Sequence, residues 1–284
     1  MNARKAVFAG SWYPGSAAEC EKEIKNFLKE GDAKSVPDRI YIGGIVPHAG
    51  WYFSGSIACN VIHHLLSDEK SPDVIAVFGM HLRPGSPNYI MAEGAWETPF
   101  GDIQIEKKLA DELVRKFSFT IETAQRFTQD NTIELQLPFI KYFFRDAKIV
   151  PMGMPPVEDS LEIGKAVADI SKRLGLRVKV IGSTDLTHYG SNYGFTPEGT
   201  GAAALDWVRN QNDRRVIEAM LAMNPSEVIR EALANQNACC SGAAAAAIAA
   251  ARQLGSERAE SVAYATSHDK HPADSFVGYA GIIF

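Results

Sequence analysis

Three of the seven histidines stand in short polar segments that directly follow apolar runs, a position where reactive side chains often occur. They are His48 in Val-Pro-His-Ala-Gly, His81 in Phe-Gly-Met-His and His188 in Thr-Asp-Leu-Thr-His. A neutral imidazole can bind a metal ion, and the same group carries protons near neutral pH. Each of these histidines could equally cap a helix or pack, so residue type alone does not decide its role.

Two adjacent cysteines, Cys239 and Cys240, precede an alanine-rich segment that is typical of a packed helix. The dipole of a helix favours a thiolate at its N-terminus, which suits metal binding or nucleophilic chemistry. A buried cysteine is also a common small apolar residue. Adjacent side chains are expected to diverge, so at most one of these thiols is predicted to bind a metal. Two imidazoles with one thiolate or carboxylate, and with open positions, suit iron(II), zinc or copper.

Asp185 and His188 are three residues apart after a predicted strand. If the segment turns into a helix, the two side chains share a face, and the carboxylate can orient the imidazole for proton transfer. The alternative is that Asp185 caps a short helix and His188 packs below it. A further carboxylate, Glu134, lies in an otherwise apolar helical segment, where it either supports a site from behind or faces solvent.

The remaining histidines carry weaker signals. His63 and His64 fall inside an amphipathic helical pattern, where a packed or surface role is the usual one. His268 and His271 lie in a polar loop before the last predicted strand. That loop is expected to be solvated, and it could cover a site at the strand ends.

The elements that must position these residues alternate between strands and helices, which predicts an α/β fold. We expect a single domain over residues 1–284 with a mixed central sheet and helices on both faces. In such open sheets, ligands bind in the crevice outside the carboxyl ends of the strands, where the three histidine segments fall. The predicted strands are Ile42–Pro47, Asp73–Phe78, Lys148–Met152, Val178–Ile181 and Phe276–Ile283, with short additions at Tyr89–Met91 and Asp102–Ile105. The predicted helices are Ala17–Lys29, Ser54–Leu66, Glu106–Phe117, Thr132–Phe143, Ser160–Leu174, Gly201–Met223, Pro225–Leu233 and Ser241–Leu254.

Composition excludes several classes of function. A net charge of −5 argues against nucleic acid or an anionic membrane as the main partner, and no segment has the roughly 20 apolar residues of a membrane span. Four cysteines, two of them adjacent, do not make a disulfide framework, and no export signal is recognisable, so we expect a cytoplasmic protein. The phosphate-binding patterns GxxxxGK and GxGxxG are absent, and so is the hydrolase pattern GxSxG.

A series of short motifs runs in order along nearly the whole chain. The motifs are Ala9-Gly-Ser-Trp-Tyr-Pro14, Val46-Pro-His-Ala-Gly50, Phe78-Gly-Met-His81, Trp96-Glu-Thr-Pro-Phe-Gly101, Glu134-Leu-Gln-Leu-Pro138, Ser183-Thr-Asp-Leu-Thr-His-Tyr189 and Val277-Gly-Tyr-Ala280. Together they resemble the motifs of the Memo family, also called AmmeMemoRadiSam system protein B. The resemblance implies a fold similar to the class III extradiol dioxygenases, which are non-haem iron enzymes that open catechol-type rings.

The resemblance also implies which residues form the site. The metal ligands would be His48, His81 and Cys239, while Asp185 and His188 would lie in the same cleft and His188 would act as an acid or base. The usual family pattern is Cys-Gly-x-Gly, so Cys240 stands where a glycine is common. A histidine common in the family is replaced here by Asn131.

Two functions follow from these implications. The first is an enzyme that performs oxygenase or other redox chemistry on a small aromatic substrate. It would use one metal ion, with Fe²⁺ favoured over copper or zinc. The second is a non-catalytic protein that binds a metal or a peptide in signalling or in metal and redox handling. The family's name points to an AMMECR-type protein and a radical SAM enzyme as partners, and neither nucleic acid nor a membrane is expected.

Overall fold

The computed structural model describes residues 3–31, 39–67 and 71–284 of the chain, and a nine-stranded mixed sheet dominates this part. Its central strands β2, β9, β3 and β8 are parallel, and they are flanked by the antiparallel strands β12 and β4. The central strands are almost entirely buried, because helices cover both faces. In spatial order the strands are β10 (His188–Tyr189), β12 (Phe276–Ile283), β2 (Gly43–Val46), β9 (Val178–Ser183), β3 (Val74–Gly79), β8 (Lys148–Gly153), β4 (Tyr89–Met91) and β7 (Thr120–Glu122), and β11 (Glu260–Thr266) pairs with β12.

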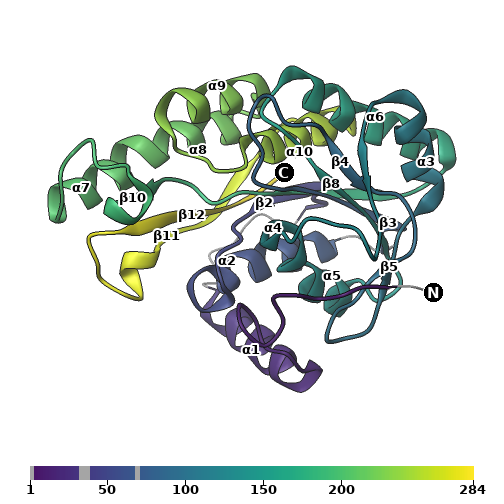
Figure 1. Ribbon diagram of the computed structural model, residues 1–284, viewed down its shortest axis with the longest axis horizontal. Coiled ribbons are helices and arrows are strands. Elements are labelled where there is room, and N and C mark those ends of the chain that lie inside the picture. Colours follow the sequence, from purple (N-terminus) through teal and green to yellow (C-terminus); the bar gives the residue numbers. More distant parts are fainter. Residues whose placement is uncertain (1–2, 32–38, 68–70) are drawn as a thin grey trace.

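Helices form a layer on each side of the sheet (Figure 1). One layer holds α1 (Ala17–Glu30), α2 (Trp51–His64), α4 (Asn131–Glu134) and α5 (Leu137–Phe143). The other holds α3 (Lys107–Lys116), α6 (Glu158–Leu174), α8 (Asp213–Leu221), α9 (Pro225–Asn235) and α10 (Ser241–Gln253), with α7 (Ala202–Trp207) at one end. Within the described residues, no helix is long and apolar enough to span a membrane.

A small second sheet lies beside the main one. It contains β1 (Ala3–Arg4), β5 (Ala95–Trp96) and β6 (Ile103–Gln104). Arg4 is buried there, and its guanidinium stacks 3.6 Å from the ring centre of Trp96 and pairs with Glu122 at 2.6 Å. This arrangement ties the N-terminus to the edge of the main sheet that carries β7.

The predicted strands and most predicted helices are confirmed, and the differences have local causes. The predicted helix Thr132–Phe143 is two helices, because Pro138 stands in the first turn of α5, where its missing N–H is tolerated. The predicted helix Gly201–Met223 contains a π-helical turn at Val208–Asn212. The predicted strand Asp102–Ile105 is shortened to β6 and belongs to the small sheet.

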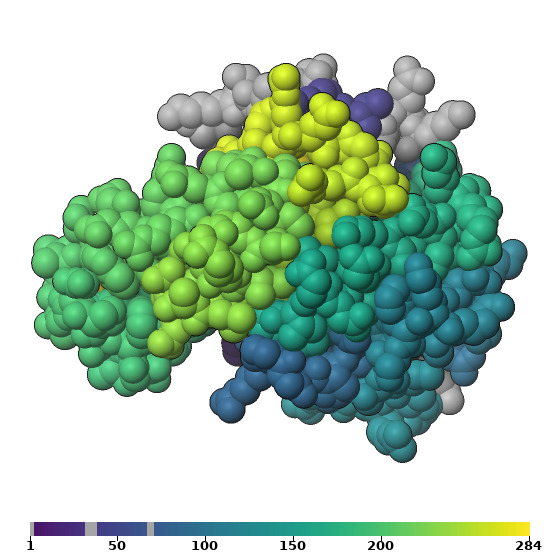
Figure 2. All heavy atoms as spheres, turned by 90° about the horizontal axis from the view of Figure 1, so that it is seen from above, coloured from purple at the N-terminus to yellow at the C-terminus, as the bar shows by residue number. Residues whose placement is uncertain are grey.

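The outer face of the second helical layer is the face seen in Figure 2. There the green segments of α7 and α8 extend beyond the rest of the molecule at one end, and the yellow-green segment of α9 lies between them and the teal segment of α6. The alanine-rich helix α10 forms the inner part of this layer and is buried from Ser241 to Ala251. It packs against β9, β3 and β2. Its N-terminus lies at the carboxyl ends of the parallel strands, since the N–H of its N-cap Cys240 donates to Thr184 Oγ1, directly after β9.

Candidate metal centre

The predicted site residues meet at one edge of the sheet because their strands are neighbours. β2, β9 and β3 are adjacent and parallel, and they end at Val46, Ser183 and Gly79. His48 and His81 therefore follow two strands that flank the strand preceding Asp185. This is the crevice position expected for a ligand in an open α/β sheet.

The side chain of His48 is buried, at 1% exposure, and every polar group on it has a partner. Its backbone N–H donates to Asp185 Oδ1 at 2.7 Å, and its Nδ1 lies 3.0 Å from Ser183 Oγ. The Ser183 hydroxyl donates its only hydrogen to the carbonyl of Thr132 at 2.7 Å, so Nδ1 of His48 must be the donor in that contact. Nε2 is thereby left to face Cys239 Sγ, 3.3 Å away.

His81 is held by the turn that follows β3. The preceding residue, Met80, has φ = 71°, a left-handed conformation that non-glycine residues rarely adopt, and its N–H donates to Thr132 Oγ1 at 2.7 Å. The turn directs the imidazole toward His48, with ring centres 4.9 Å apart. Nδ1 of His81 lies 3.6 Å from Asp130 Oδ2, which leaves Nε2 available to a ligand.

Cys239 reaches the same place from the loop before α10. Its N–H donates to the carbonyl of Asp185 at 3.1 Å, and its Sγ lies 3.8 Å from Thr184 Oγ1. Burial alone would raise the pKa of Cys239, but hydrogen bonds with Cys240 and His48 and the charge of His48 lower it well below the ordinary value for a thiol. A thiolate of this kind is a good metal ligand.

The structure therefore brings four potential ligand atoms together, one each from His48, His81, Cys239 and Cys240, all within 4.8 Å of one another. Nitrogen and sulfur donors at this spacing fit one transition-metal ion. The prediction that the adjacent thiols diverge is wrong, since their sulfurs lie 3.7 Å apart. Cys240 is the N-cap of α10, and its backbone is not helical, with φ −127° and ψ 49°.

Asp185 and His188 lie beside this cluster, but not in the arrangement that the spacing suggested. Residues 184–187 form no helix, and His188 begins the short strand β10, so the helical pairing of the two side chains is wrong and Asp185 is no helix cap. Nδ1 of His188 instead lies 3.1 Å from the carbonyl of Leu186. Asp185 contacts His48, and burial raises the pKa of its carboxyl group despite the opposing charge of His48.

A cavity of about 590 Å³ opens beside the cluster. Its polar lining includes His48, His81, Asp185, His188 and Asn131. Exposed aromatic side chains form part of its wall, namely Trp12, Tyr52 and Tyr193. A pocket with apolar walls and a few convergent polar groups is the usual form of a small-molecule site.

Of the other histidines and carboxylates noted in the sequence, some lie at the cavity and some do not. His271, in the polar loop before β12, lines the cavity, while His268 bonds the backbone of Ala273. Glu134 is fully buried and accepts hydrogen bonds from Phe8 N–H and Tyr13 OH, so it does not face solvent.

Sequence reasoning missed the residues that orient the two imidazoles. Asp130, Thr132 and Ser183 stand behind the donor set, each in contact with His48, with His81 or with the backbone that carries it. The only signal for Asp130 was its place two residues before the predicted helix Thr132–Phe143, close to where an N-cap would stand. It does cap α4, accepting from the N–H of Thr132 at 3.0 Å, and it uses its second oxygen toward His81.

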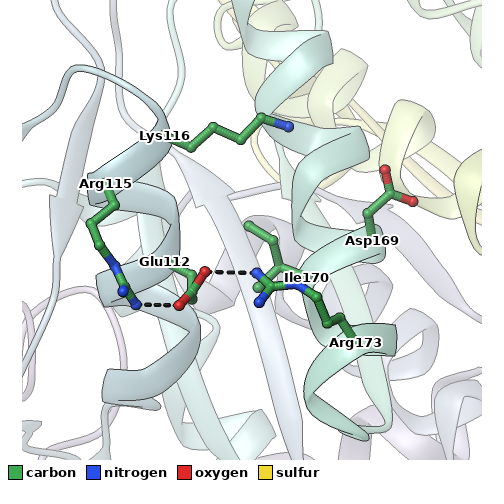
Figure 3. A pocket seen from close by; sticks show the side chains of 6 residues that line it. All are labelled: Glu112, Arg115, Lys116, Asp169, Ile170 and Arg173. Atoms are coloured by element: carbon green, nitrogen blue, oxygen red, sulfur yellow. Dashed lines mark hydrogen bonds and ion pairs between the residues drawn. The ribbon is translucent and has the colours of Figure 1, made fainter.

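A second cavity, of about 540 Å³, lies between α3 and α6, away from this cluster. Figure 3 shows Glu112 from α3 pairing with Arg115 and with Arg173 from α6, the latter at 2.6 Å. These charges largely satisfy one another; the two arginine side chains are exposed, and Glu112 is partly buried. The arrangement fits a surface ion-pair network between two helices.

The fold and the donor cluster define an α/β protein with a candidate histidine–cysteine metal site at its strand ends. The chain belongs to the Memo family, since the profile of the Memo-like protein family matches residues 4–283. It is 33% identical to a MEMO1 family protein of Pyrococcus furiosus over 293 residues, covering 99% of this chain and 98% of the relative. It is 31% identical to a MEMO1 family protein of Methanopyrus kandleri, again over 99% and 98% of the two chains.

A solved structure supports the architecture. An uncharacterized protein from Escherichia coli K12 superposes with a TM-score of 0.54 at 12% sequence identity, covering 87% of this chain and 100% of that one. At so low an identity the likeness concerns the fold alone. It agrees with the predicted α/β class and with the mixed sheet.

Proposed function

We propose that the protein holds one metal ion, Fe²⁺, on His48, His81 and Cys239 and acts as a non-haem oxygenase or related redox enzyme. The substrate would be a small aromatic molecule in the adjacent cavity. The observation that carries this proposal is the meeting of three donors, from two strand ends and a helix start, beside a cavity that also contains Asp185 and His188.

The donor set fits such an ion in number and kind. Two imidazoles and one anionic ligand with open positions resemble the facial set of non-haem iron oxygenases, with a thiolate in place of the carboxylate. Both imidazoles have the outer partners that metal-bound histidines usually have, Ser183 for His48 and Asp130 for His81. A redox-active ion bound here would supply the activation of oxygen that these side chains cannot perform.

The chain's own residues would bind the substrate and move its protons. His188 contacts the carbonyl of Leu186 through Nδ1, so its Nε2 is free to accept or donate a proton within the cavity. Trp12, Tyr52 and Tyr193 offer ring faces on which a planar molecule can stack.

Metal content tests the binding part of the proposal. Protein purified without an affinity tag and loaded anaerobically with Fe²⁺ should contain about one ion per chain, as expected for a mononuclear site. His48→Ala and His81→Ala should lose it, because each removes a donor. His63→Ala, on the far part of α2, is the matched control and should retain the ion. Full metal content in the first two variants would place the site elsewhere.

Oxygen consumption tests the catalytic part. The iron-loaded protein should consume oxygen with at least one member of a panel of catechol-type and indole-type compounds. His188→Ala should abolish that turnover while retaining the metal, since His188 belongs to the cavity and not to the donor cluster. Turnover that survives His188→Ala would remove this residue from the chemistry.

A second candidate function is non-catalytic binding of a metal or a peptide. The second thiol, Cys240, favours metal handling, because paired sulfurs suit copper or zinc. Exposed aromatic side chains at the cavity suit a peptide. AMMECR-type and radical SAM proteins are the partners that we propose, in a cytoplasmic setting that keeps all four cysteines reduced. A broad substrate screen without turnover would favour this function.

A further inference from the structure

A second thiol lies against the proposed metal ligands and has no role in the three-donor site. The side chain of Cys240 is buried, at 2% exposure, and its sulfur belongs to the group of four donor atoms within 4.8 Å of one another.

The spacing of the sulfurs is that of two ligands on one ion. With metal–sulfur bonds of about 2.3 Å, two thiolates of a tetrahedral site lie about 3.8 Å apart. The sulfurs of Cys239 and Cys240 are 3.7 Å apart. A sulfur and a nitrogen ligand would lie about 3.5 Å apart, and Cys239 Sγ is 3.3 Å from His48 Nε2. These donors need little movement to share an ion.

The backbone holds both thiols in place. The N–H of Cys239 donates to the carbonyl of Asp185 at 3.1 Å, and the N–H of Cys240 donates to Thr184 Oγ1 at 3.0 Å. Both contacts are made to the loop that follows β9, the strand between those that lead to His48 and His81. The cysteine pair is thus fixed to the same strand ends that carry the imidazoles.

The two cysteines and the two histidines reach the cluster from different sides. His48 and His81 line the cavity wall, whereas neither cysteine does. Two thiolates from the α10 side would complete a four-coordinate site, and the ion would have to expand to five-coordination to bind a molecule from the cavity.

We propose that Cys240 is a fourth ligand, so that this chain holds its ion with two nitrogens and two sulfurs. The proposal rests on the proposed function only in requiring that His48, His81 and Cys239 bind a metal. Two thiolates balance the charge of a divalent ion and favour soft ions. Zn²⁺ and Cu⁺ are thus expected to compete with Fe²⁺ more strongly here than at a site with one thiolate.

Cobalt and zinc binding test the fourth ligand without reference to activity. Under anaerobic, reducing conditions, the thiolate-to-cobalt absorption of the Co²⁺-loaded protein counts sulfur ligands. Cys240→Gly and Cys240→Ser should each show about half of the wild-type absorption per bound ion. Both replacements are good helix N-caps, so α10 should keep its start. Cys59→Ala, which removes a buried thiol of α2 outside the cluster, is the control and should match wild type.

Zinc affinity, measured by competition with a chromophoric chelator, gives the second readout. Loss of Cys240 should weaken it by more than about 100-fold, which exceeds the roughly 10- to 100-fold loss typical of an outer partner. Unchanged cobalt absorption in the Cys240 variants, or a smaller loss of zinc affinity, would overturn the fourth ligand and leave the three-donor site intact. A wild-type protein that binds neither ion would overturn both proposals.

Discussion

At the scale of single residues, each imidazole of the candidate site is oriented by a neighbouring side chain that is not itself a proposed metal ligand. Ser183 fixes the proton of His48 on Nδ1 because its own hydroxyl is committed to Thr132. Asp130 does the same for His81 through the charge on its Oδ2 atom. Burial lowers the pKa of His81, but hydrogen bonds and the charges of Asp130 and Cys239 outweigh it and raise that pKa. Because the His81 side chain is 46% exposed, solvent screens part of this effect.

Asp130→Asn tests this orientation. The amide keeps the shape of the side chain and is itself a good N-cap for α4, so the fold should persist. It removes the charge that attracts the Nδ1 proton of His81, and metal affinity should fall by about 10- to 100-fold. Isothermal titration with Zn²⁺ measures the change, and the exposed Asp146→Asn serves as the matched control. Equal affinities in the two variants would show that Asp130 does not orient His81.

At the scale of elements, the parallel core was predictable because its strands are short apolar runs bounded by turn residues. Weaker patterns failed: β7 and β11 were not predicted, and β11 is a half-buried edge segment whose Ser and Ala residues give little strand signal. The π-helical turn at Val208–Asn212 also has no signature in the apolar periodicity. Elements that form only through long-range pairing were thus not predicted from local sequence patterns.

The candidate site, too, was predictable from the sequence only in part. His48 and His81 were predictable as residues that follow strands, since strand ends converge by topology alone. The arrangement of the Asp185 and His188 side chains was not predictable, because hydrogen bonds to distant residues shape their loop. Leu186 N–H donates to the Gly278 carbonyl, and that contact exists only in the folded sheet. Spacing along the chain therefore locates an edge of the sheet, but not side-chain pairs within a loop.

The contact between α6 and α10 permits a test of packing between elements. Gly164, in α6, faces α10 so closely that an added Cβ would lie 2.3 Å from the carbonyl oxygen of Ala246. In an open helix, Gly→Ala stabilises by up to about 1 kcal/mol. Here Gly164→Ala should destabilise by about 1–3 kcal/mol, because the two helices must separate. Urea denaturation gives the sign, with the half-exposed Lys165→Ala as control. A stabilised Gly164→Ala protein would contradict the close contact.

At the scale of the whole molecule, one buried carboxylate joins the site loop to the C-terminal strands. Asp213, at the start of α8, accepts hydrogen bonds from Thr187 N–H at 3.0 Å, from the Thr187 hydroxyl, and from the Tyr264 hydroxyl at 2.8 Å. An added Cβ at Gly278 would lie 2.0 Å from its Oδ2, so β12 passes directly over it. The π-helical turn before α8 thus brings one carboxylate to the loop of His188, to β11 and to β12.

This carboxylate should give the folded protein a specific pH dependence. Burial raises the pKa of Asp213 to about 6, against the opposing hydrogen bonds, whereas an unfolded chain releases this proton near 3.8. The stabilisation associated with this proton is fully present below about pH 3.8 and is lost as the pH rises through about 6. The loss is on the order of 3 kcal/mol. Other carboxylates also make the free energy of unfolding depend on pH. The useful quantity is therefore the free energy of unfolding of wild type minus that of Asp213→Asn.

Asp213→Asn cannot lose a proton, so it lacks this component of the pH dependence. The free energy of unfolding of wild type minus that of Asp213→Asn should therefore fall between pH 4 and pH 7, by a value on the order of 3 kcal/mol. Urea denaturation followed by fluorescence at several pH values measures it. A difference that stays constant with pH would mean that the pKa of Asp213 is the same in the folded and unfolded chains, so that its three hydrogen bonds offset its burial. A difference that rises would mean that they hold its pKa below that of the unfolded chain.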